Sequence, residues 1–376
     1  MRIGITCPHN IFAGGGVGEV VRALQKGLEK KGHYVRILTP KPRDFNGDIP
    51  KEIITLGMSV KTKAFAGTAW QWSVSVDNNE VDAILEREQF DVLHFHEPWI
   101  PFWSQQLVQR SRAVNIATLH AASFDNMGSK YVKNVVTPYT KPMIKYFDEF
   151  TAVSEAATSY FRTLSDRPVQ IIPNGIDLRR YSKRPSSSVR HPKMKTIFYV
   201  GRLEDRKGVK FLLRAFNELT TKHKDVQLLI AGSGPDENKL REYVTELAIP
   251  RVTFLGYIND EEKIHQMHRA DVFCSPARYG ESFGIVLLEA MAAGTPTVAG
   301  DNSGYISTMK DLGAISLVNP QDTIDFARRL ELLIFNEELR KAWQKWAKNY
   351  VKQFDYKHVV DMYEDCYKKA LKKHKK

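Results

Sequence analysis

The stretch TIFYVGRLEDRKG, residues 196–208, has the order of a strand, a glycine-bounded loop and the start of a helix. Its first five residues are β-branched, aromatic or aliphatic, a composition typical of a buried strand. The residues after Gly208 place apolar side chains at the spacing of an amphipathic helix. Because strands that alternate with helices form parallel sheets, this stretch predicts the first unit of an α/β domain.

The same alternation occurs on both sides of a polar segment. In the first half we expect strands at residues 2–7, 35–39, 91–95, 115–119, 150–153 and 169–172. In the second half we expect them at residues 196–200, 227–231, 252–255, 272–274, 297–299 and 315–318. The segment KRPSSSVRHPKMK, residues 183–195, lies between the two halves; it is polar, contains proline and lacks periodicity, as linkers do.

The length of the chain favours two domains. It has 376 residues, more than a single hydrophobic core usually serves. We therefore predict two Rossmann-like, doubly wound α/β domains, residues 1–183 and 195–355, that face a central cleft. Near the end of the chain, apolar residues at helical spacing predict helices at 336–352 and 357–373.

The composition excludes several classes of protein. Cys7, Cys274 and Cys366 lie far apart and lack the spacing of zinc ligands, so neither a disulfide framework nor a zinc site is expected. The first residues resemble a strand and not a signal peptide, and no apolar run approaches the roughly 20 residues of a membrane span. We expect a cytoplasmic protein.

The net charge is concentrated at the C-terminal end. The formal charge is +12, and residues 367–376 contain six lysines and no acidic residue. These lysines either form a frayed, solvated helix end or contact anionic lipid on the inner face of the cell membrane, at about 1 kcal/mol per lysine near the surface. Nucleic acid is not an expected partner, because no binding motif or aromatic platform accompanies the lysines. No pattern indicates an oligomeric state.

Candidate site residues follow the strands of the first domain. Gly15 and Gly16 lie in the loop GGGVG after the first strand, which either lets backbone amides approach a diphosphate or forms a tight structural turn. His120 follows the strand 115–119, at the edge where open α/β sheets bind ligands, unless it is a core histidine. His94, His96 and Glu97 end another strand; without a third ligand at defined spacing, a hydrogen-bonded strand end is favoured over a metal site.

In the second domain, Arg202 and Lys207 follow the strand of the opening stretch. Both side chains can reach a diphosphate, Arg202 by paired hydrogen bonds and Lys207 as a point charge, or both are solvated surface charges. The turn Gly232-Ser233-Gly234 also ends a strand and begins a helix, and we expect its role to be structural.

The stretch ESFGIVLLE, residues 281–289, joins a loop to a helix. Backbone amides of Phe283 and Gly284 would lie at the helix N-terminus, where phosphate oxygens are favoured. Eight residues separate Glu281 from Glu289, about two helical turns, so both carboxylates are expected on one side of the helix. They would accept hydrogen bonds from sugar and ribose hydroxyls; the alternative is a capping residue and a surface residue.

Taken together, these motifs resemble those of the retaining glycosyltransferases of family 4, which have the GT-B fold of two Rossmann-like domains. Within that family the chain is similar to the phosphatidylinositol mannosyltransferases. The resemblance covers almost the whole chain, and it includes RIGITCP, LHFHEP, ATLH, IIPNGID and ESFGIVLLEAMAAGTP. It implies transfer of a hexose, with mannose from GDP-mannose as the best assignment, to a lipid head group such as phosphatidylinositol.

The resemblance also implies roles for individual residues. Glu281 would contact donor-sugar hydroxyls and, with His120, form the catalytic pair; Glu289 would bind the ribose. The other donor contacts are Gly15, Gly16, Arg202, Lys207, Ser282, Phe283, Gly284 and Ile285. Apart from the resemblance, the residues expected on the acceptor or membrane side are His9, Asn10, Lys130 and Lys133; the two lysines belong to residues 130–147, a stretch without acids that contains apolar anchors. The helix at 357–376 would return to the first domain.

No metal or other cofactor is expected besides the nucleotide-sugar co-substrate, because no DxD triplet occurs in the sequence. Two features depart from the subgroup. Residues 121–126 lack the basic residue that follows this histidine in the mannosyltransferases, and DNSGY at 301–305 replaces the common GGxPE. Three alternative functions therefore stay open. One is a family 4 enzyme that uses a UDP-sugar and a soluble or polysaccharide-precursor acceptor; the others are a nucleotide-sugar epimerase and a non-catalytic lipid-binding protein.

Overall fold

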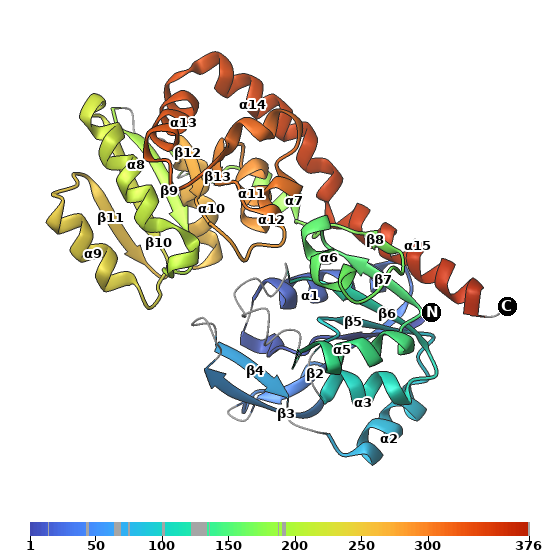
Figure 1. The fold of residues 1–376 in the computed structure, drawn as a ribbon. Coiled ribbons are helices and arrows are strands. Elements are labelled where there is room, and N and C mark those ends of the chain that lie inside the picture. Colours follow the sequence, from blue (N-terminus) through green and yellow to red (C-terminus); the bar gives the residue numbers. More distant parts are fainter. Residues whose placement is uncertain are drawn as a thin grey trace. The chain divides into compact units, whose positions relative to one another are not determined.

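The computed structural model describes residues 1–13, 15–42, 45–63, 69–73, 76–99, 102–121, 134, 136–186, 188–189 and 193–374. The chain forms two compact units. Unit 1 comprises Met1–Gly175 and Tyr356–Lys376, and unit 2 comprises Ile176–Asp355. Each unit contains one sheet with helices packed against it (Figure 1).

The sheet of unit 1 has the order β4-β3-β2-β1-β5-β6-β7-β8. The strands are β1 (Arg2–Thr6), β2 (Tyr34–Pro42), β3 (Ile53–Lys63), β4 (Ala69–Ser73), β5 (Val92–His96), β6 (Val114–Leu119), β7 (Glu149–Ala152) and β8 (Val169–Ile171). All neighbours are parallel except β3 and β4, which are antiparallel. The strand order reverses between β1 and β5, which is where doubly wound sheets bind ligands.

Strands β3 and β4 were not expected from the sequence. In β3, polar and apolar residues alternate around Gly57, so the strand lacks the continuous apolar run that marks its buried neighbours. Strand β4 is short, and within the described residues its one partner is β3, with Ser59 opposite Ser73. This antiparallel pair extends one edge of an otherwise parallel sheet.

The helices of unit 1 cover its sheet. They are α1 (Gly16–Lys30), α2 (Asn78–Glu88), α3 (Trp103–Arg110), α5 (Thr137–Met143), α6 (Glu155–Arg162) and α15 (Tyr356–His374), with short 3-10 turns η1 (Ile11–Ala13) and η3 (Ile144–Tyr146). Helix α1 begins at Gly16, directly after Gly15 of the glycine loop. Asp77 and Ser154 cap α2 and α6 through their side chains.

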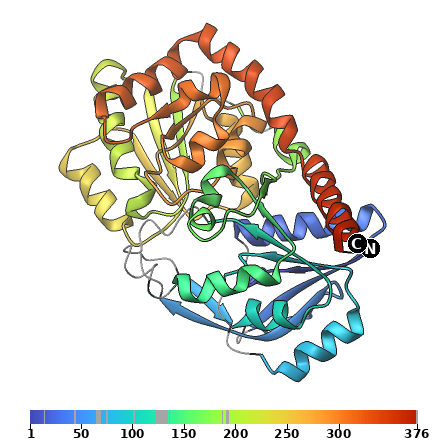
Figure 2. The same ribbon diagram turned by 45° about the vertical axis from the view of Figure 1, so that its right-hand side comes forward.

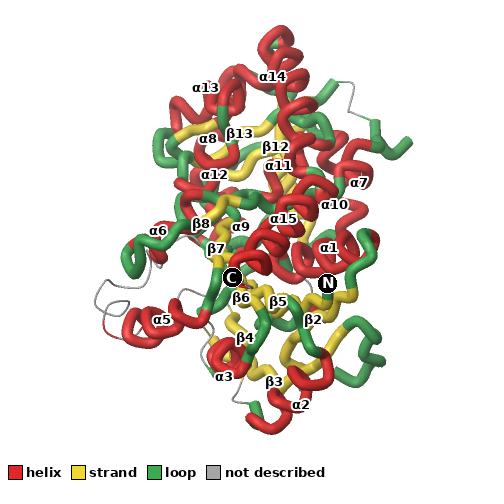
Figure 3. Tube along the Cα trace, turned by 90° about the vertical axis from the view of Figure 1, so that its right-hand side faces the viewer, coloured by secondary structure: helices red, strands yellow, loops and turns green. Residues whose placement is uncertain are grey.

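The C-terminal helix α15 is part of unit 1 and lies beside α1 (Figures 2 and 3). Tyr363 and Tyr367 of α15 are buried in the same core cluster as β1 and α1. A Cβ atom added to Gly27 would lie 2.4 Å from Val360, so glycine permits the close contact of the two helices. The lysine-rich end is helical through His374, and Lys373 pairs with Glu149, so among the described residues the lysines are solvated on an intact helix and not on a frayed end.

Unit 2 has a six-stranded parallel sheet of order β11-β10-β9-β12-β13-β14. Its strands are β9 (Lys195–Val200), β10 (Val226–Ala231), β11 (Val252–Gly256), β12 (Val272–Ser275), β13 (Thr297–Gly300) and β14 (Leu317–Val318). Numbered within the unit this order is 3-2-1-4-5-6, the Rossmann order. Its reversal lies between β9 and β12, so the loops after these two strands are neighbours.

The helices of unit 2 are α7 (Leu178–Ser182), α8 (Val209–Lys222), α9 (Glu237–Glu246), α10 (Asp260–Arg269), α11 (Ile285–Ala292), α12 (Ser303–Thr308), α13 (Thr323–Phe335) and α14 (Glu337–Tyr350), with 3-10 turns η4 (Asp205–Lys207), η5 (Asp311–Ser316) and η6 (Val351–Phe354). Most of these helices alternate with the strands of the unit, whereas α7 precedes β9 and α13 and α14 follow β14. The expected strand at 315–318 is half wrong, because Ile315 and Ser316 belong to η5.

The units divide between Gly175 and Ile176, earlier than the expected boundary at 183. Residues 176–183 belong to unit 2 because Tyr181 is buried there and donates a hydrogen bond to Glu289. Among the described residues, no helix has both the length and the hydropathy needed to span a membrane.

Candidate functional site

The loops after β9 and β12 pack closely at the strand-order reversal of unit 2. Gly208 has φ +72°, and a Cβ atom there would lie 2.1 Å from the carbonyl oxygen of Pro276. The backbone N–H of Arg278 donates to the carbonyl oxygen of Arg206 at 2.8 Å. Only glycine fits at position 208, so the two loops are held together backbone to backbone.

A second glycine turn supports this arrangement. A Cβ atom at Gly232 would lie 1.9 Å from the carbonyl oxygen of Gly201, and one at Gly234 would lie 2.2 Å from that of Leu203. The turn Gly232-Ser233-Gly234 therefore packs directly on the loop that carries Arg202. The close contact requires glycine at both positions, so the role of this turn is structural, as expected from the sequence.

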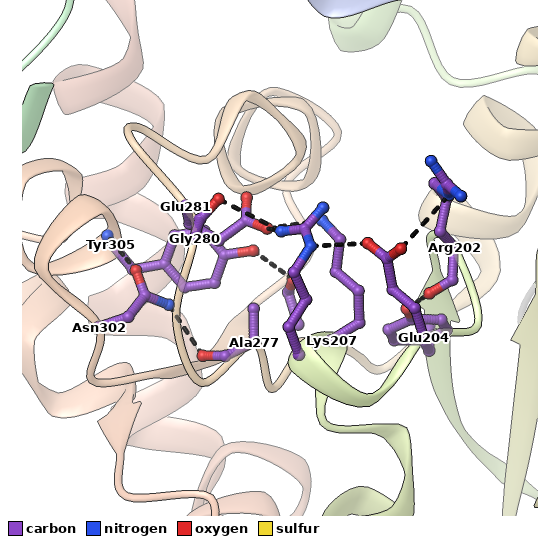
Figure 4. Close-up of polar contacts among 11 residues, drawn as sticks. Arg202, Glu204, Lys207, Ala277, Gly280, Glu281, Asn302 and Tyr305 are labelled. Atoms are coloured by element: carbon purple, nitrogen blue, oxygen red, sulfur yellow. Dashed lines mark hydrogen bonds and ion pairs between the residues drawn. The ribbon is translucent and has the colours of Figure 1, made fainter. Parts of the chain in front are cut away.

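Glu281 is the centre of an ion-pair cluster formed by the two loops (Figure 4). Its Oε1 atom accepts hydrogen bonds from Nζ of Lys207 at 2.6 Å and from Nη1 of Arg206 at 2.9 Å. The side chain of Glu281 is 14% exposed, so the carboxylate is partly desolvated. The structure thus brings together Lys207 and Glu281, which the sequence analysis assigned to one site.

Arg206 is a member of this cluster that the sequence analysis missed. Its Nε atom lies 2.7 Å from Oε1 of Glu204, and its Nη1 atom also donates to the carbonyl oxygen of Gly280 at 3.2 Å. Arg206 therefore links the carboxylates of Glu204 and Glu281. The signal was its position one residue before Lys207, on the same 3-10 turn η4.

Arg202 lies at the outer end of the cluster. Its Nε atom is 3.6 Å from Oε2 of Glu204, and its side chain is 48% exposed. The buried carboxylate of Glu204 thus has Arg206 on one oxygen and Arg202 near the other. With Lys207, these residues place three cations at one edge of the sheet, an arrangement that suits a diphosphate.

Two buried tyrosines lie beneath the cluster. The hydroxyl of Tyr199 donates to the carbonyl oxygen of Arg202 at 2.9 Å, and the hydroxyl of Tyr305 lies 2.8 Å from Oγ of Ser275. Burial raises the pKa of both phenols, and the nearby carboxylate of Glu281 raises them further. Both hydroxyls are therefore neutral, and they fix the loops without adding charge.

Helix α11 begins after Gly284, which has φ +90°. A Cβ atom at Gly284 would lie 2.7 Å from the ring of Tyr305. The side chain of Phe283 is buried and packs on Phe354, with 5.8 Å between ring centroids. For Phe283, therefore, only the backbone is available to a ligand. Ser282 and Ile285 are both partly exposed.

Glu281 and Glu289 do not share one side of a helix, which corrects the expectation. The helix begins only at Ile285, so Glu281 lies in the preceding loop. Glu289 is buried, and its Oε1 atom accepts from the hydroxyl of Tyr181 at 2.6 Å and from Nζ of Lys263 at 2.9 Å. The two carboxylates belong to separate networks of the same unit, and Glu289 is neither a cap nor a surface residue.

In unit 1, three histidines lie close together: His94 and His96 belong to β5, and His120 directly follows β6. Nδ1 of His96 lies 2.7 Å from Nε2 of His120, and both rings are buried. Burial lowers the pKa of His120 to about 3 and that of His96 well below its usual range. Both imidazoles are therefore neutral, so one donates to the other; Nε2 of His96 finds no partner among the residues that the structure describes.

His94 belongs to the core. Its Nδ1 atom lies 2.7 Å from the hydroxyl of Tyr367 on α15, and its Nε2 atom lies 2.5 Å from Oγ1 of Thr118. Burial lowers its pKa to about 3. Glu97 next to this strand has φ +53°, and burial raises its pKa to about 7. Within the described part of the chain, no group of three or more histidines, cysteines or carboxylates is arranged to hold a metal ion.

The remaining predicted residues of unit 1 lie near the loop after β1. Gly15 has φ +122° and precedes α1, and both Gly15 and Gly16 are exposed, with open space around an added Cβ atom. The side-chain oxygen of Asn10 accepts from the backbone N–H of Phe12 at 2.9 Å, and burial lowers the pKa of His9. The predicted Lys130 and Lys133 lie outside the described residues.

Two family models match the chain, one in each half. Residues 14–180 match the model for glycosyltransferase family 4, and residues 182–350 match that for glycosyl transferases group 1. A phosphatidyl-myo-inositol mannosyltransferase of Mycolicibacterium smegmatis is 32% identical over 95% of this chain and 90% of its own length. An N-acetyl-alpha-D-glucosaminyl L-malate synthase of Bacillus anthracis is 27% identical over 99% of this chain and 98% of its own length.

Solved structures share the fold. Sucrose-phosphate synthase of Thermosynechococcus elongatus superposes with a TM-score of 0.78 at 23% identity, covering 98% of each chain. Anabaena HepE, solved with UDP and glucose, superposes with a TM-score of 0.74 at 18% identity, covering 98% of this chain and all of its own. At these identities the likeness concerns the arrangement of strands and helices.

Proposed function

The chain belongs to glycosyltransferase family 4, and from this membership we propose that it moves mannose from GDP-mannose to a hydroxyl of a lipid head group such as phosphatidylinositol. The mannosyltransferase relatives, which align along nearly the whole chain, support the choice of donor sugar and acceptor. The observation that carries the donor site is the pairing of Lys207 and Arg206 with one oxygen of Glu281.

The donor diphosphate is proposed to bind at the loops after β9 and β12. Lys207, Arg206 and Arg202 supply positive charge there, and the N-terminus of α11 supplies backbone amides. Because Glu281 holds two of the cations in place, they need little reorganisation when the leaving group develops charge. Oε2 of Glu281, which does not take part in those two hydrogen bonds, is available to a sugar hydroxyl.

The reaction breaks the bond between the anomeric carbon and the diphosphate oxygen and forms one from that carbon to the acceptor oxygen. We propose that the configuration is retained by attack on the face that the diphosphate leaves, with a donor phosphate oxygen taking the acceptor proton. The acceptor is proposed to bind near His120, which follows β6, the neighbour of β5 in the sheet of unit 1. A neutral His120 can donate or accept a hydrogen bond there without adding charge.

The direct test is a panel of GDP- and UDP-sugars incubated with lipid extracts and with soluble sugars. We expect GDP-mannose and phosphatidylinositol to give a mannosylated lipid with retained configuration, identified by mass spectrometry and NMR. Turnover with UDP-sugars alone would contradict the choice of donor. Turnover with soluble acceptors alone would contradict the choice of a lipid.

The second candidate is a family 4 enzyme that uses a UDP-sugar and a soluble acceptor. The specific observation in its favour is the similarity to an N-acetyl-alpha-D-glucosaminyl L-malate synthase. In α12, Asn302 donates to the carbonyl oxygen of Ala277 at 2.8 Å and caps the backbone N–H of Tyr305. The residues at 301–305 thus contact the loop that carries Glu281. The panel above separates the two candidates.

Activity is expected to survive removal of divalent cations. Three cationic side chains already lie at the proposed diphosphate site, and the sequence offers no DxD triplet to hold a metal against the leaving group. The measurement is the transfer rate after dialysis against EDTA, compared with the rate after re-addition of Mg²⁺ or Mn²⁺. A loss that only the metal restores would contradict neutralisation by side chains.

The protein is also expected to bind anionic liposomes at low salt. The exposed Lys369 and Lys372 of α15, together with Lys130 and Lys133, would supply the positive charge. Because exposed charges are screened within about 8 Å at physiological salt, binding should fall steeply as salt rises. The measurement is sedimentation with anionic and with neutral liposomes at low and high ionic strength.

Substitutions of lysine by glutamine identify which positive charges bind the liposomes. Variants K369Q/K372Q and K130Q/K133Q should each bind more weakly than the control K222Q/K239Q, which removes two exposed lysines of unit 2. Shortening the chain is unsuitable, because α15 buries Tyr367 and Ala370. Equal, negligible binding to both kinds of liposome would move the search to soluble acceptors.

A further inference from the structure

One buried carboxylate of unit 2 has both of its hydrogen bonds on the same oxygen. Oε1 of Glu289 accepts from the hydroxyl of Tyr181 at 2.6 Å and from Nζ of Lys263 at 2.9 Å. Glu289 is 6% exposed and Tyr181 is 5% exposed. Two donors on one oxygen fix the rotation of the carboxylate, a torsion that otherwise has broad minima.

The charges around Glu289 balance without Tyr181. Lys263 also lies 3.3 Å from Oδ1 of Asp260, and Oδ2 of Asp260 lies 3.0 Å from Nη2 of Arg180. The two carboxylates of this chain are thus matched by two cations. Tyr181 therefore orients the carboxylate of Glu289 and does not contribute to the charge balance. Burial, together with the neighbouring carboxylate of Glu289, raises the pKa of Tyr181, so its hydroxyl stays a donor.

Tyr181 is itself held firmly. It lies on the short helix α7, a few residues after the division between the two units, and α7 packs on α11, which carries Glu289. Nε2 of His268 donates to the carbonyl oxygen of Tyr181 at 2.8 Å. The ring of Tyr181 lies 5.7 Å from Nζ of Lys263. Backbone, ring and hydroxyl are each fixed by a different contact.

We propose that Tyr181 is a positioning residue that sets the selectivity of this enzyme for the ribose of its donor. With Lys263 it occupies Oε1 of Glu289, so that Oε2 is left in a fixed place to accept the ribose hydroxyls. The inference rests on the proposed function, in which Glu289 binds the ribose. It adds that the geometry of this contact depends on a hydroxyl which touches neither the sugar nor the diphosphate.

The test measures nucleotide binding by calorimetry, which requires neither the sugar nor the acceptor to be known. The probes are GDP and UDP and their dideoxyribose counterparts. The wild-type protein should bind the ribonucleotide more tightly than its dideoxy counterpart. The variant Tyr181→Phe should bind the ribonucleotide about 5- to 10-fold more weakly, the scale of one ordinary hydrogen bond, because Lys263 still holds Oε1 of Glu289. Its affinity for the dideoxy form should be unchanged.

Two further variants distinguish positioning from folding. Tyr243→Phe removes a hydroxyl of α9 that accepts from Nε of Arg214 on α8, and it should change neither affinity. Adding Tyr181→Phe to Glu289→Gln should cause little additional loss, because both act on one contact. With saturating acceptor and varied donor, Tyr181→Phe should raise the KM for the donor and leave kcat near the wild-type value.

The outcomes that overturn the proposal are distinct. An equal loss for the ribo and dideoxy forms would assign Tyr181 a structural role only. If the wild-type protein discriminates between the sugars and Tyr181→Phe does so equally well, the positioning role is wrong while the proposed function stands. If no nucleoside diphosphate binds to the wild-type protein, the proposed function fails and the inference fails with it.

Discussion

Replacing Glu281 with alanine is expected to reduce the transfer rate by at least about 100-fold, the scale found when one preorganised polar contact to a transition state is lost. The substitution removes the acceptor for Lys207 and Arg206 and the proposed contact to the donor sugar. The cations would then move when the diphosphate leaves, and this motion adds to the barrier. The measurement is kcat/KM with the donor and acceptor found in the panel.

Folding should survive this substitution. The side chains of Arg206 and Lys207 stay in contact with water, so neither becomes an isolated buried charge when Glu281 is removed. The matched control is Glu337→Ala, which removes an exposed carboxylate paired with Lys341 on α14 and should change stability little, because exposed ion pairs are screened by solvent. If Glu281→Ala retains wild-type turnover while its thermal unfolding is normal, Glu281 is not part of the site.

Much of the fold follows from local patterns. Eleven of the twelve expected strands coincide with observed ones to within a few residues, because strands buried on both faces appear as short apolar runs. The exception, at 315–318, contains only two strand residues after the turn η5. The edge pair β3 and β4 was missed because its residues alternate in polarity and include tryptophan, glutamine and lysine.

The sequence predicted which residues belong to the site better than it predicted how they are arranged. Lys207 and Glu281 meet because the strand order reverses between β9 and β12, a fact of topology that spacing along the chain cannot give. Helical periodicity placed Glu281 and Glu289 on one face, but Gly284 has a positive φ and starts the helix later. Arg206 and Tyr181 were missed because each acts through partners more than 70 residues away in the sequence.

Replacing Lys207 with alanine is expected to weaken binding of the nucleoside diphosphate by about 1.5–3 kcal/mol, the contribution of a hydrogen bond to a charged group. The side chain of Lys207 is 19% exposed and held by Glu281, so it is already in place for the phosphate. Arg202→Ala should have a smaller effect, because a side chain that is 48% exposed is more strongly screened by solvent.

The affinities of the protein for nucleoside diphosphate and for nucleoside monophosphate show which phosphate Lys207 contacts. If Lys207 contacts the outer phosphate, Lys207→Ala should reduce the preference of the protein for the diphosphate and leave the affinity for the monophosphate nearly unchanged. The control is Lys210→Ala on α8, which removes the same charge from the same unit at a residue whose amine lies 5.2 Å from the ring of Tyr243. Because long-range attraction is screened by salt and a direct contact is screened less, the Lys207 effect should persist at high ionic strength. Equal losses for both nucleotides, or equal effects of Lys207→Ala and Lys210→Ala, would mean that Lys207 acts as general surface charge and not as a phosphate contact.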